Sequence, residues 1–148
     1  MLKLSKLTDY AIVILSAMSK DTTHVHAAIE LSTTTGIALP TVSKILKLLL
    51  AGKILVSTRG AKGGYMLAKE PENISVAAVI TAMDGPISLT ECSISHDGCE
   101  QSAGCELRGN WTLINQAIQQ ALESVTLADM IRTPIPQEVR IPIASLYR

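Results

Sequence analysis

Apolar side chains recur every three or four residues along the first third of the chain, which is the period of an α-helix with one buried face. This spacing predicts a first helix over Ser5–Met18 and a shorter second helix over Ala27–Thr35, which Gly36 would end. A third helix begins at Leu39-Pro40, where proline suits a first turn. Its buried stripe would consist of Val42, Ile45, Leu46, Leu49 and Leu50.

Strand-like segments follow the third helix at Ile54–Thr58 and Tyr65–Ala68, joined by the glycine-rich run from Arg59 to Gly64. A helix, a helix–turn–helix and a hairpin, in this order, are typical of a winged helix-turn-helix. We therefore expect a mostly α fold with a small β-hairpin, in which residues 1–70 form a DNA-binding domain.

The second half of the chain again shows the helical spacing of apolar residues, here over a longer segment. Residues 71–91 read as a linker and a connecting helix that Ser75 caps, and residues 133–148, with three prolines, read as an irregular tail. Between them, residues 107–132 predict one helix of about 20 residues, about 30 Å long. Its apolar positions are Trp111, Ile114, Ile118, Ala121 or Leu122, Val125 and Ala128. This face is larger than a small domain covers, so we expect it to pair with a second copy in a homodimer; the alternative is that it packs back on its own domain.

Charge separates the same two halves, although the 13 basic and 13 acidic residues cancel overall. Residues 1–70 carry a net charge of +5 and residues 71–148 a net charge of −5. Between Leu31 and Lys69 there are six basic residues and no acidic one. This segregation favours a surface that binds a polyanion over chance asymmetry on a solvated surface.

Other function classes find little support in the sequence. Apolar runs are too short for a membrane span, and Asp9 interrupts the weak likeness to a signal peptide. No nucleotide-binding glycine motif and no nucleophile–histidine–acid set is present, so we expect neither an enzyme nor a small-molecule substrate. We expect a cytoplasmic protein, because an odd number of clustered cysteines fits a reducing compartment.

The third helix and the hairpin supply the candidate contacts to double-stranded DNA. A recognition helix reads base edges with its first turns, and a wing reaches the adjacent backbone or minor groove. The alternative is an ordinary solvated helix face. The candidates for bases are Thr41, Ser43 and Lys44, those for phosphates are Lys47, Lys53 and Lys62, and the candidate for a minor groove is Arg59. A dimer would read an imperfect palindrome with half-sites about one helical turn apart.

The three cysteines of the chain, Cys92, Cys99 and Cys105, lie within fourteen residues, and glycines precede the last two. We interpret residues 92–106 as a loop whose thiols converge on a soft metal centre, one ligand short of the usual four. Unligated thiols, a zinc site and a thiol redox switch are the alternatives. Acidic residues around the loop raise the pKa of a thiol, which disfavours the redox switch.

Several segments together resemble the bacterial winged-helix repressors of the IscR/NsrR type. They are Leu4–Ala11, Leu39–Leu46, Arg59–Ala68 and the three-cysteine loop, within a resemblance that runs from about Leu2 to Met130. Residues 40–46 look most similar to the branch that regulates the SUF cluster-assembly operon. The resemblance implies a homodimeric transcription regulator that binds an iron–sulfur cluster, [2Fe-2S] or [4Fe-4S], through Cys92, Cys99 and Cys105.

The fourth ligand differs between the two types. IscR-type members place a histidine three residues after the last cysteine, where this chain has Arg108, which cannot bind a metal. NsrR-type members use an aspartate of the partner subunit near the start of the first helix, and the matching residue is Asp9. Asp9 equally suits the first turn of a helix because of the helix dipole. The other candidates are His96, Glu91 and Glu106.

From this resemblance we expect a repressor of cluster-assembly genes that senses cluster status, iron, oxidants or nitric oxide through a labile cluster, and that represses in its cluster-bound form. The alternative is a winged-helix regulator that uses Cys92, Cys99 and Cys105 as a thiol switch or a zinc site.

Overall fold

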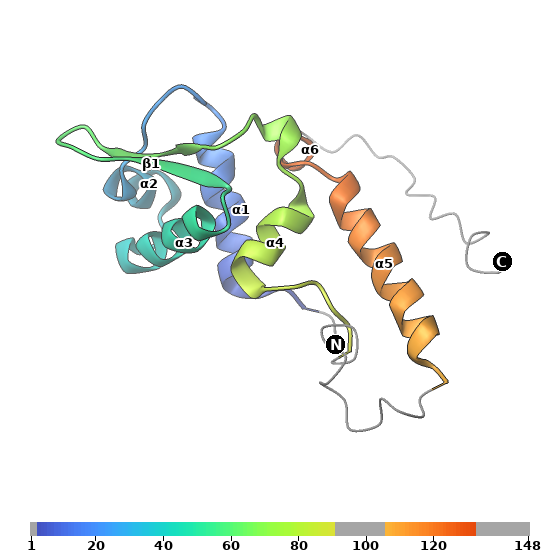
Figure 1. Ribbon diagram of the computed structural model, residues 1–148. Coiled ribbons are helices and arrows are strands. Elements are labelled where there is room, and N and C mark those ends of the chain that lie inside the picture. Colours follow the sequence, from blue (N-terminus) through green and yellow to red (C-terminus); the bar gives the residue numbers. More distant parts are fainter. Residues whose placement is uncertain (1–2, 91–105, 133–148) are drawn as a thin grey trace.

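The computed structural model describes residues 3–90 and 106–132, and within them the chain folds mainly into helices with one small hairpin (Figure 1). The helices are α1 (Lys6–Met18), α2 (Ala28–Thr35), α3 (Leu39–Ala51), the 3-10 helix η1 (Pro71–Asn73), α4 (Val76–Asp84), α5 (Arg108–Ser124) and α6 (Leu127–Ile131). The strands are β1 (Leu55–Thr58) and β2 (Gly64–Leu67). The predicted fold class, mostly α with a β-hairpin in a winged-helix arrangement, is confirmed.

The core lies where the helical periodicity placed it, between α1, α2, α3 and α4. Ile14 and Leu15 of α1 and Leu46 and Leu49 of α3 are fully buried. Local signals fix the ends of these helices. The Ser5 hydroxyl accepts a hydrogen bond from the Thr8 amide at the start of α1, and Gly36 ends α2 in the left-handed conformation, with φ of 73°.

The hairpin is antiparallel, with Leu55 opposite Leu67 and Thr58 opposite Gly64. A third segment joins β2 close to the turn of the hairpin, because His26 and Tyr65 exchange two backbone hydrogen bonds of 2.9 and 2.8 Å. Gly64 makes this contact possible, since a Cβ there would lie 2.4 Å from the His26 carbonyl oxygen. The wing is thus anchored to the loop between α1 and α2.

The predicted single helix through Ala128 is wrong. Helix α5 ends at Ser124, and α6 starts at Leu127 after Thr126, whose hydroxyl accepts a hydrogen bond from the Asp129 amide, while the Asp129 carboxylate accepts from Thr126. This capping box begins a new helix and turns the chain. Leu127 and Ala128 are buried, and α6 packs against α1 and η1, so this last part does pack back on its own domain.

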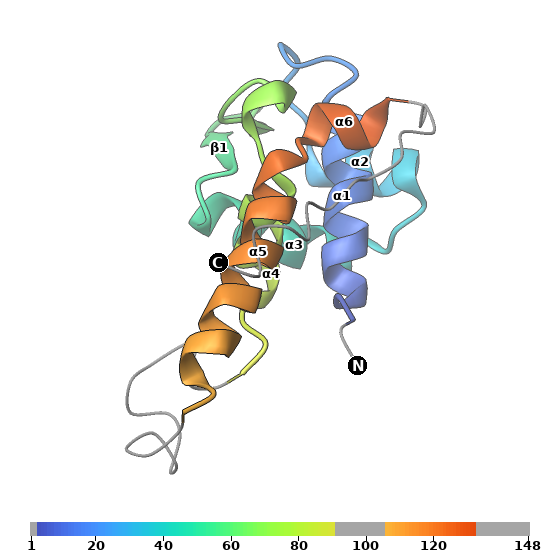
Figure 2. The same ribbon diagram turned by 90° about the vertical axis from the view of Figure 1, so that its right-hand side faces the viewer.

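Helix α5 itself makes few contacts with the rest of the described chain. It packs against α4, and Figures 1 and 2 show its first turns extending beyond the other helices. Trp111, Leu113 and Ile114 remain 40%, 54% and 38% exposed. Among the described residues no single helix is long and apolar enough to cross a membrane, and only α2 and α3 taken together, bent by 119°, reach the required length and composition.

Candidate nucleic-acid interface and metal-binding residues

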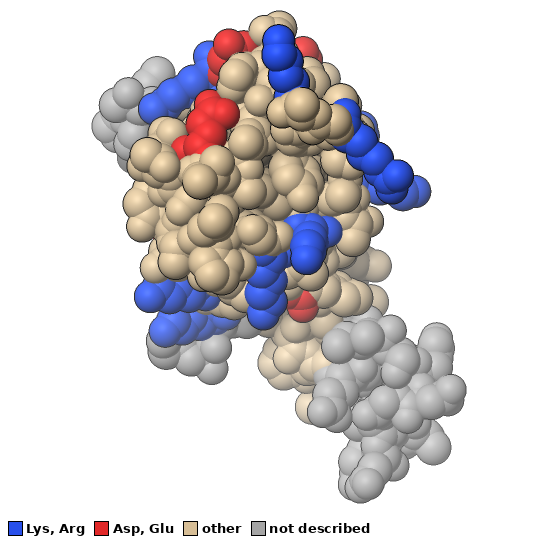
Figure 3. Space-filling model, turned by 90° about the vertical axis from the view of Figure 1, so that its left-hand side faces the viewer, with Lys and Arg blue, Asp and Glu red and all other residues tan. Residues whose placement is uncertain are grey.

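The polar side of α3 carries the residues predicted to read bases. Lys44 and Lys47 are exposed, while Thr41 and Ser43 are half-buried beside the apolar stripe. Figure 3 looks onto the end of the molecule that holds the wing tip, α2 and α3, and basic side chains lie at several places around and across this face, with most of the acidic ones near its top. The structure therefore brings a recognition-type helix to a surface with positive charge.

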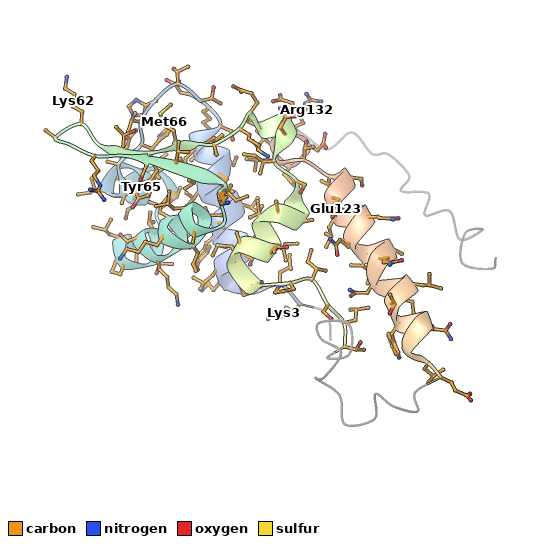
Figure 4. The ribbon with its side chains drawn as sticks, in the orientation of Figure 1. Lys3, Lys62, Tyr65, Met66, Glu123 and Arg132 are labelled. Carbon is orange, nitrogen blue, oxygen red and sulfur yellow. The ribbon has the colours of Figure 1, made fainter. Side chains whose placement is uncertain are left out.

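The wing adds two exposed cations, Arg59 and Lys62, and Lys62 projects from the hairpin tip (Figure 4). Gly60 has φ of 120°, and a Cβ on Gly63 would lie 2.4 Å from the Thr58 carbonyl oxygen, so the tight tip requires both glycines. Within residues 3–90 and 106–132, Lys44, Lys47, Arg59 and Lys62 form no ion pair with an acidic side chain. These cations are thus available to phosphate groups. Lys53 follows α3 in the left-handed conformation, with φ of 60°, and is exposed.

The cysteine loop itself, with Cys92, Cys99, Cys105, Glu91 and His96, lies outside the described residues. The segments that flank it are held by α5. The Asn115 side chain accepts a hydrogen bond from the Leu89 amide (3.1 Å) and donates one to the Ile87 carbonyl (3.1 Å). On the other side, the exposed Glu106 lies in the turn that leads into α5. Asn115 therefore fixes the chain just before the cysteines to the helix that begins just after them.

Asp9 lies in the first turn of α1 and is exposed, as both the ligand and the helix-dipole interpretations require. It borders a hollow of about 770 Å³, which is lined by apolar side chains, among them Ile12, Ile80 and Met130, and by polar ones around the start of α1. A carboxylate at the edge of such a hollow is accessible to another chain. Thiolates together with an exposed carboxylate form a donor set that fits an iron–sulfur cluster.

The turn that carries Asp9 is tied to the end of α4. Asp84 accepts hydrogen bonds from the Thr8 hydroxyl (2.7 Å) and the Ser5 amide (3.3 Å). Burial raises the pKa of Asp84, but the hydrogen bonds from Ser5 and Thr8 outweigh it and hold the pKa below its usual value of 3.8. Because α4 leads into the segment before the cysteines, this contact joins the two regions that contain the predicted metal ligands.

One side-chain cluster was missed in the sequence. His24, His26 and Glu30 meet where the loop after α1 enters α2, with one ligand atom of each within 4.8 Å of the others. The hydrogen bond from His24 lowers the pKa of Glu30, while burial opposes this shift, so Glu30 is a carboxylate at neutral pH. The signal was present as a His-x-His pair with glutamate four residues after the second histidine, at the start of a predicted helix.

Together the fold, the cations of α3 and the wing, and the glycine-dependent hairpin define a protein of the winged-helix class. Residues 4–133 match the family model of Rrf2, described as iron-dependent transcriptional regulators, and the chain belongs to this family. The resemblance to IscR-type regulators seen in the sequence is confirmed.

Among the relatives that the chain matches are HTH-type transcriptional regulators called IscR. The protein of Sodalis glossinidius is 31% identical over 102 residues, which cover 69% of this chain and 61% of that protein. The protein of Yersinia enterocolitica is 31% identical over 69% of this chain and 62% of its own length. The chain thus spans about three-fifths of the length of the relatives it matches.

Solved structures share the fold. CymR, the global cysteine regulator of B. subtilis, superposes with a TM-score of 0.66 at 27% identity, covering 88% of this chain and 97% of that one. T. potens IscR superposes with a TM-score of 0.63 at 24% identity, covering 88% and 86%. The two neighbours share one architecture but have different names, since one is called a cysteine regulator and the other IscR.

Proposed function

We propose that this protein is a homodimeric transcription regulator that binds double-stranded DNA through α3 and the wing. One observation carries the proposal: the cations of α3 and of the wing, Lys44, Lys47, Arg59 and Lys62, are exposed and form no ion pair within the described chain. Phosphate contacts from such cations position a protein on DNA, while side chains of the recognition helix read bases. The names of its relatives, which are HTH-type transcriptional regulators, support the same function.

The exposed apolar side of α5 supports the homodimer. Trp111 and Ile114 are large apolar side chains on the apolar stripe of a helix that, among the described elements, packs closely only against α4, and leaving them in water is unfavourable. A second copy supplies an identical face, and pairing the two places two winged-helix domains on one duplex. Such a dimer reads an imperfect palindrome.

For sensing, we propose that Cys92, Cys99 and Cys105 hold an iron–sulfur cluster and that Asp9 of the partner subunit completes its ligands. When bound, the cluster supplies a centre that responds to iron supply, oxidants and nitric oxide. The donor chemistry supports this, as do the iron-dependent description of the family and the exposure of Asp9 at the edge of a hollow. A carboxylate is a weak ligand beside thiolates, which suits a sensor that must release its cluster.

The chain's own contacts offer a route from the loop to the DNA-binding surface. Asn115 holds the segment before the cysteines on α5, and Asp84 holds the end of α4 on the first turn of α1. Helix α1 in turn packs against α3. A shift of the loop therefore reaches the recognition helix through packed elements, and we propose that the cluster-bound form represses genes of cluster assembly.

A second candidate keeps the DNA binding but makes the cysteines a thiol switch or a zinc site. The structural likeness to CymR, a protein called a cysteine regulator, favours a signal that is sensed without an iron–sulfur cluster. Iron and sulfide content separates the two candidates, because a thiol switch or a zinc site contains neither.

The test is a mixed dimer purified without oxygen from two differently tagged chains. One chain carries Asp9→Ala with its cysteines intact, and the other keeps Asp9 but has serine at positions 92, 99 and 105. In this mixed dimer the chain that has the cysteines lacks Asp9, so the cysteines can meet Asp9 only across the two subunits. We expect iron and sulfide in the mixed dimer and a cluster that survives air as long as one in the wild type.

The Asp9→Ala homodimer is expected to lose its cluster faster, and Glu106→Ala serves as the matched acidic control, with wild-type stability. If the mixed dimer loses its cluster as fast as the Asp9→Ala homodimer, Asp9 is not a ligand across subunits. A wild-type protein that contains zinc, or no metal, under these conditions would favour the second candidate.

A further inference from the structure

The cluster of His24, His26 and Glu30 lies beside β2 of the wing and has no part in the function proposed above. We propose that it is a second metal site, which binds a divalent transition-metal ion of the zinc type and clamps the wing to the loop between α1 and α2. Two imidazoles and a carboxylate are ligands that Zn²⁺ takes in sites with an open fourth position. None of the three ligands is a cysteine, so this site can be tested independently of the proposed iron–sulfur cluster.

The distances between the ligand atoms are close to those of a metal site. Nε2 of His24 lies 3.1 Å from Oε1 of Glu30, and Nδ1 of His26 lies 3.8 Å from the same oxygen. Two ligands at Zn–N and Zn–O distances of about 2.0–2.1 Å in tetrahedral geometry lie about 3.3 Å apart. His24 and Glu30 are half-exposed, so small rotations of their side chains can close the remaining gap.

His26 is prepared for this role by its other ring nitrogen. Nε2 of His26 lies 3.2 Å from the Asp21 carbonyl oxygen, which only accepts hydrogen bonds, so Nε2 carries the proton. In the neutral ring Nδ1 then keeps a lone pair that faces Glu30. A hydrogen bond from the second nitrogen to a carbonyl is the arrangement that orients metal-binding histidines.

The other two side chains are also held in place by local contacts. Asp21 accepts hydrogen bonds from the amides of Thr23 and His24, which fixes the turn that presents His24. Glu30 receives a 3.4 Å hydrogen bond from the Ala27 amide at the start of α2. His26 is buried, and the open side of the site faces solvent past His24 and Glu30.

The position of the site gives it a consequence for the wing. His26 exchanges two backbone hydrogen bonds with Tyr65, the second residue of β2, and the Tyr65 side chain lies along the hairpin in Figure 4. A metal ion on the His26 ring would hold this bridge against Glu30 of α2, the first helix of the helix-turn-helix. Metal binding would therefore restrict the motion of the wing relative to α2 and α3.

The test uses the full chain with serine at positions 92, 99 and 105, so that thiolates cannot bind the probe, which is Zn²⁺ itself. Calorimetric titration is expected to show one zinc ion per chain. Glu30→Gln keeps an oxygen for the Ala27 amide but removes the carboxylate, and is expected to weaken zinc binding by at least about tenfold. His96→Ala, which removes the remaining histidine, is the matched control and should bind zinc as the parent does.

Hydrogen–deuterium exchange supplies the readout on the wing. Zinc is expected to slow exchange of the His26 and Tyr65 amides in the parent and to leave it unchanged in Glu30→Gln. His24→Gln, a substitution of an exposed side chain outside the helices, is a second variant in case Glu30→Gln does not fold. Equal zinc affinity in the parent and in the folded variant would overturn the site, and zinc binding without slower exchange would overturn the clamp.

Discussion

The two ends of the chain use apolar side chains in opposite ways. In α1 and α3 most of the apolar stripe is buried, and Leu46 is inaccessible to solvent, whereas Trp111 and Ile114 on the stripe of α5 are 40% and 38% exposed. Charge differs too, because residues 1–70 carry a net +5 and residues 71–148 a net −5. The first region buries its apolar stripe within one chain, while α5 leaves part of its stripe in water, where the proposed second copy would cover it. The difference teaches that, in the proposed function, recognition is built into one subunit and its control depends on the assembly.

The largest expected effect compares two apolar side chains. Leu46→Ala removes a fully buried side chain and should lower the free energy of unfolding by about 2–5 kcal/mol. Ile114→Ala removes a side chain of the α5 stripe that is 38% exposed, and should change the unfolding of the monomer much less while weakening the dimer. Urea denaturation and sedimentation at several concentrations measure the two quantities. A loss of monomer stability for Ile114→Ala as large as that for Leu46→Ala would break the comparison.

The next prediction compares two glycines, one beside the wing and one in α5. Gly64→Ala places a Cβ 2.4 Å from the His26 carbonyl oxygen, so the backbone must shift where β2 meets the segment of His26. We expect the free energy of unfolding to fall by about 1–3 kcal/mol. Gly109 lies in the first turn of α5 with open space where a Cβ would be. Gly109→Ala should therefore raise stability slightly, by about 0.5–1 kcal/mol or less. Thermal denaturation of both variants measures this, and equal effects would contradict the close packing of the wing.

Two arginines test recognition itself. Arg59→Ala should weaken specific DNA binding by about 1–3 kcal/mol, because it removes a cation of the wing. Arg132→Ala, well away from Lys62 of the wing tip in Figure 4, is the matched control and should bind as the wild type does. The operator is first selected from random duplex DNA with the full-length protein, and affinities are measured at fixed salt. Unchanged affinity for Arg59→Ala would remove Arg59 from the interface.

The smallest expected effect concerns pH and Asp84. Because the folded pKa of Asp84 lies below its usual value of 3.8, its carboxylate stabilises the fold above about pH 4, and this contribution is lost as the pH falls through the folded pKa. The difference in the free energy of unfolding between the wild type and Asp84→Asn should therefore shrink as the pH is lowered, which acid denaturation measures. In a Thr8→Ala background, which lacks the 2.7 Å hydrogen bond, the difference should be small at every pH. A difference that persists unchanged at low pH would contradict this role.

Local signals allowed most of the winged-helix region to be predicted from the sequence. Ser5 and Ser75 cap α1 and α4, and Gly36 ends α2, as their residue types indicated. The break after α5 was missed because Val125 and Ala128 continue the apolar period. The stronger signal was the capping box of Thr126 and Asp129, which starts α6.

The candidate site was less predictable, for a physical reason. Sequence spacing gathers Cys92, Cys99 and Cys105 on one segment, but a ligand from a partner subunit, as proposed for Asp9, has no local signal in the sequence. The contact of Asp84 with Thr8 joins residues 76 positions apart, and no local pattern encodes it. The assignment of Asp9 and of the DNA-contacting residues therefore stays a prediction.

The measurement that tests the central claim most directly is operator affinity as a function of cluster content. Protein purified without oxygen, the same protein stripped of iron, and Cys99→Ser are compared on one operator at one salt concentration. The account predicts that the iron-loaded wild type binds at least about tenfold more tightly than the other two, which corresponds to about 1.4 kcal/mol of coupling. Equal affinity for all three forms would contradict the claim that the C-terminal region controls recognition.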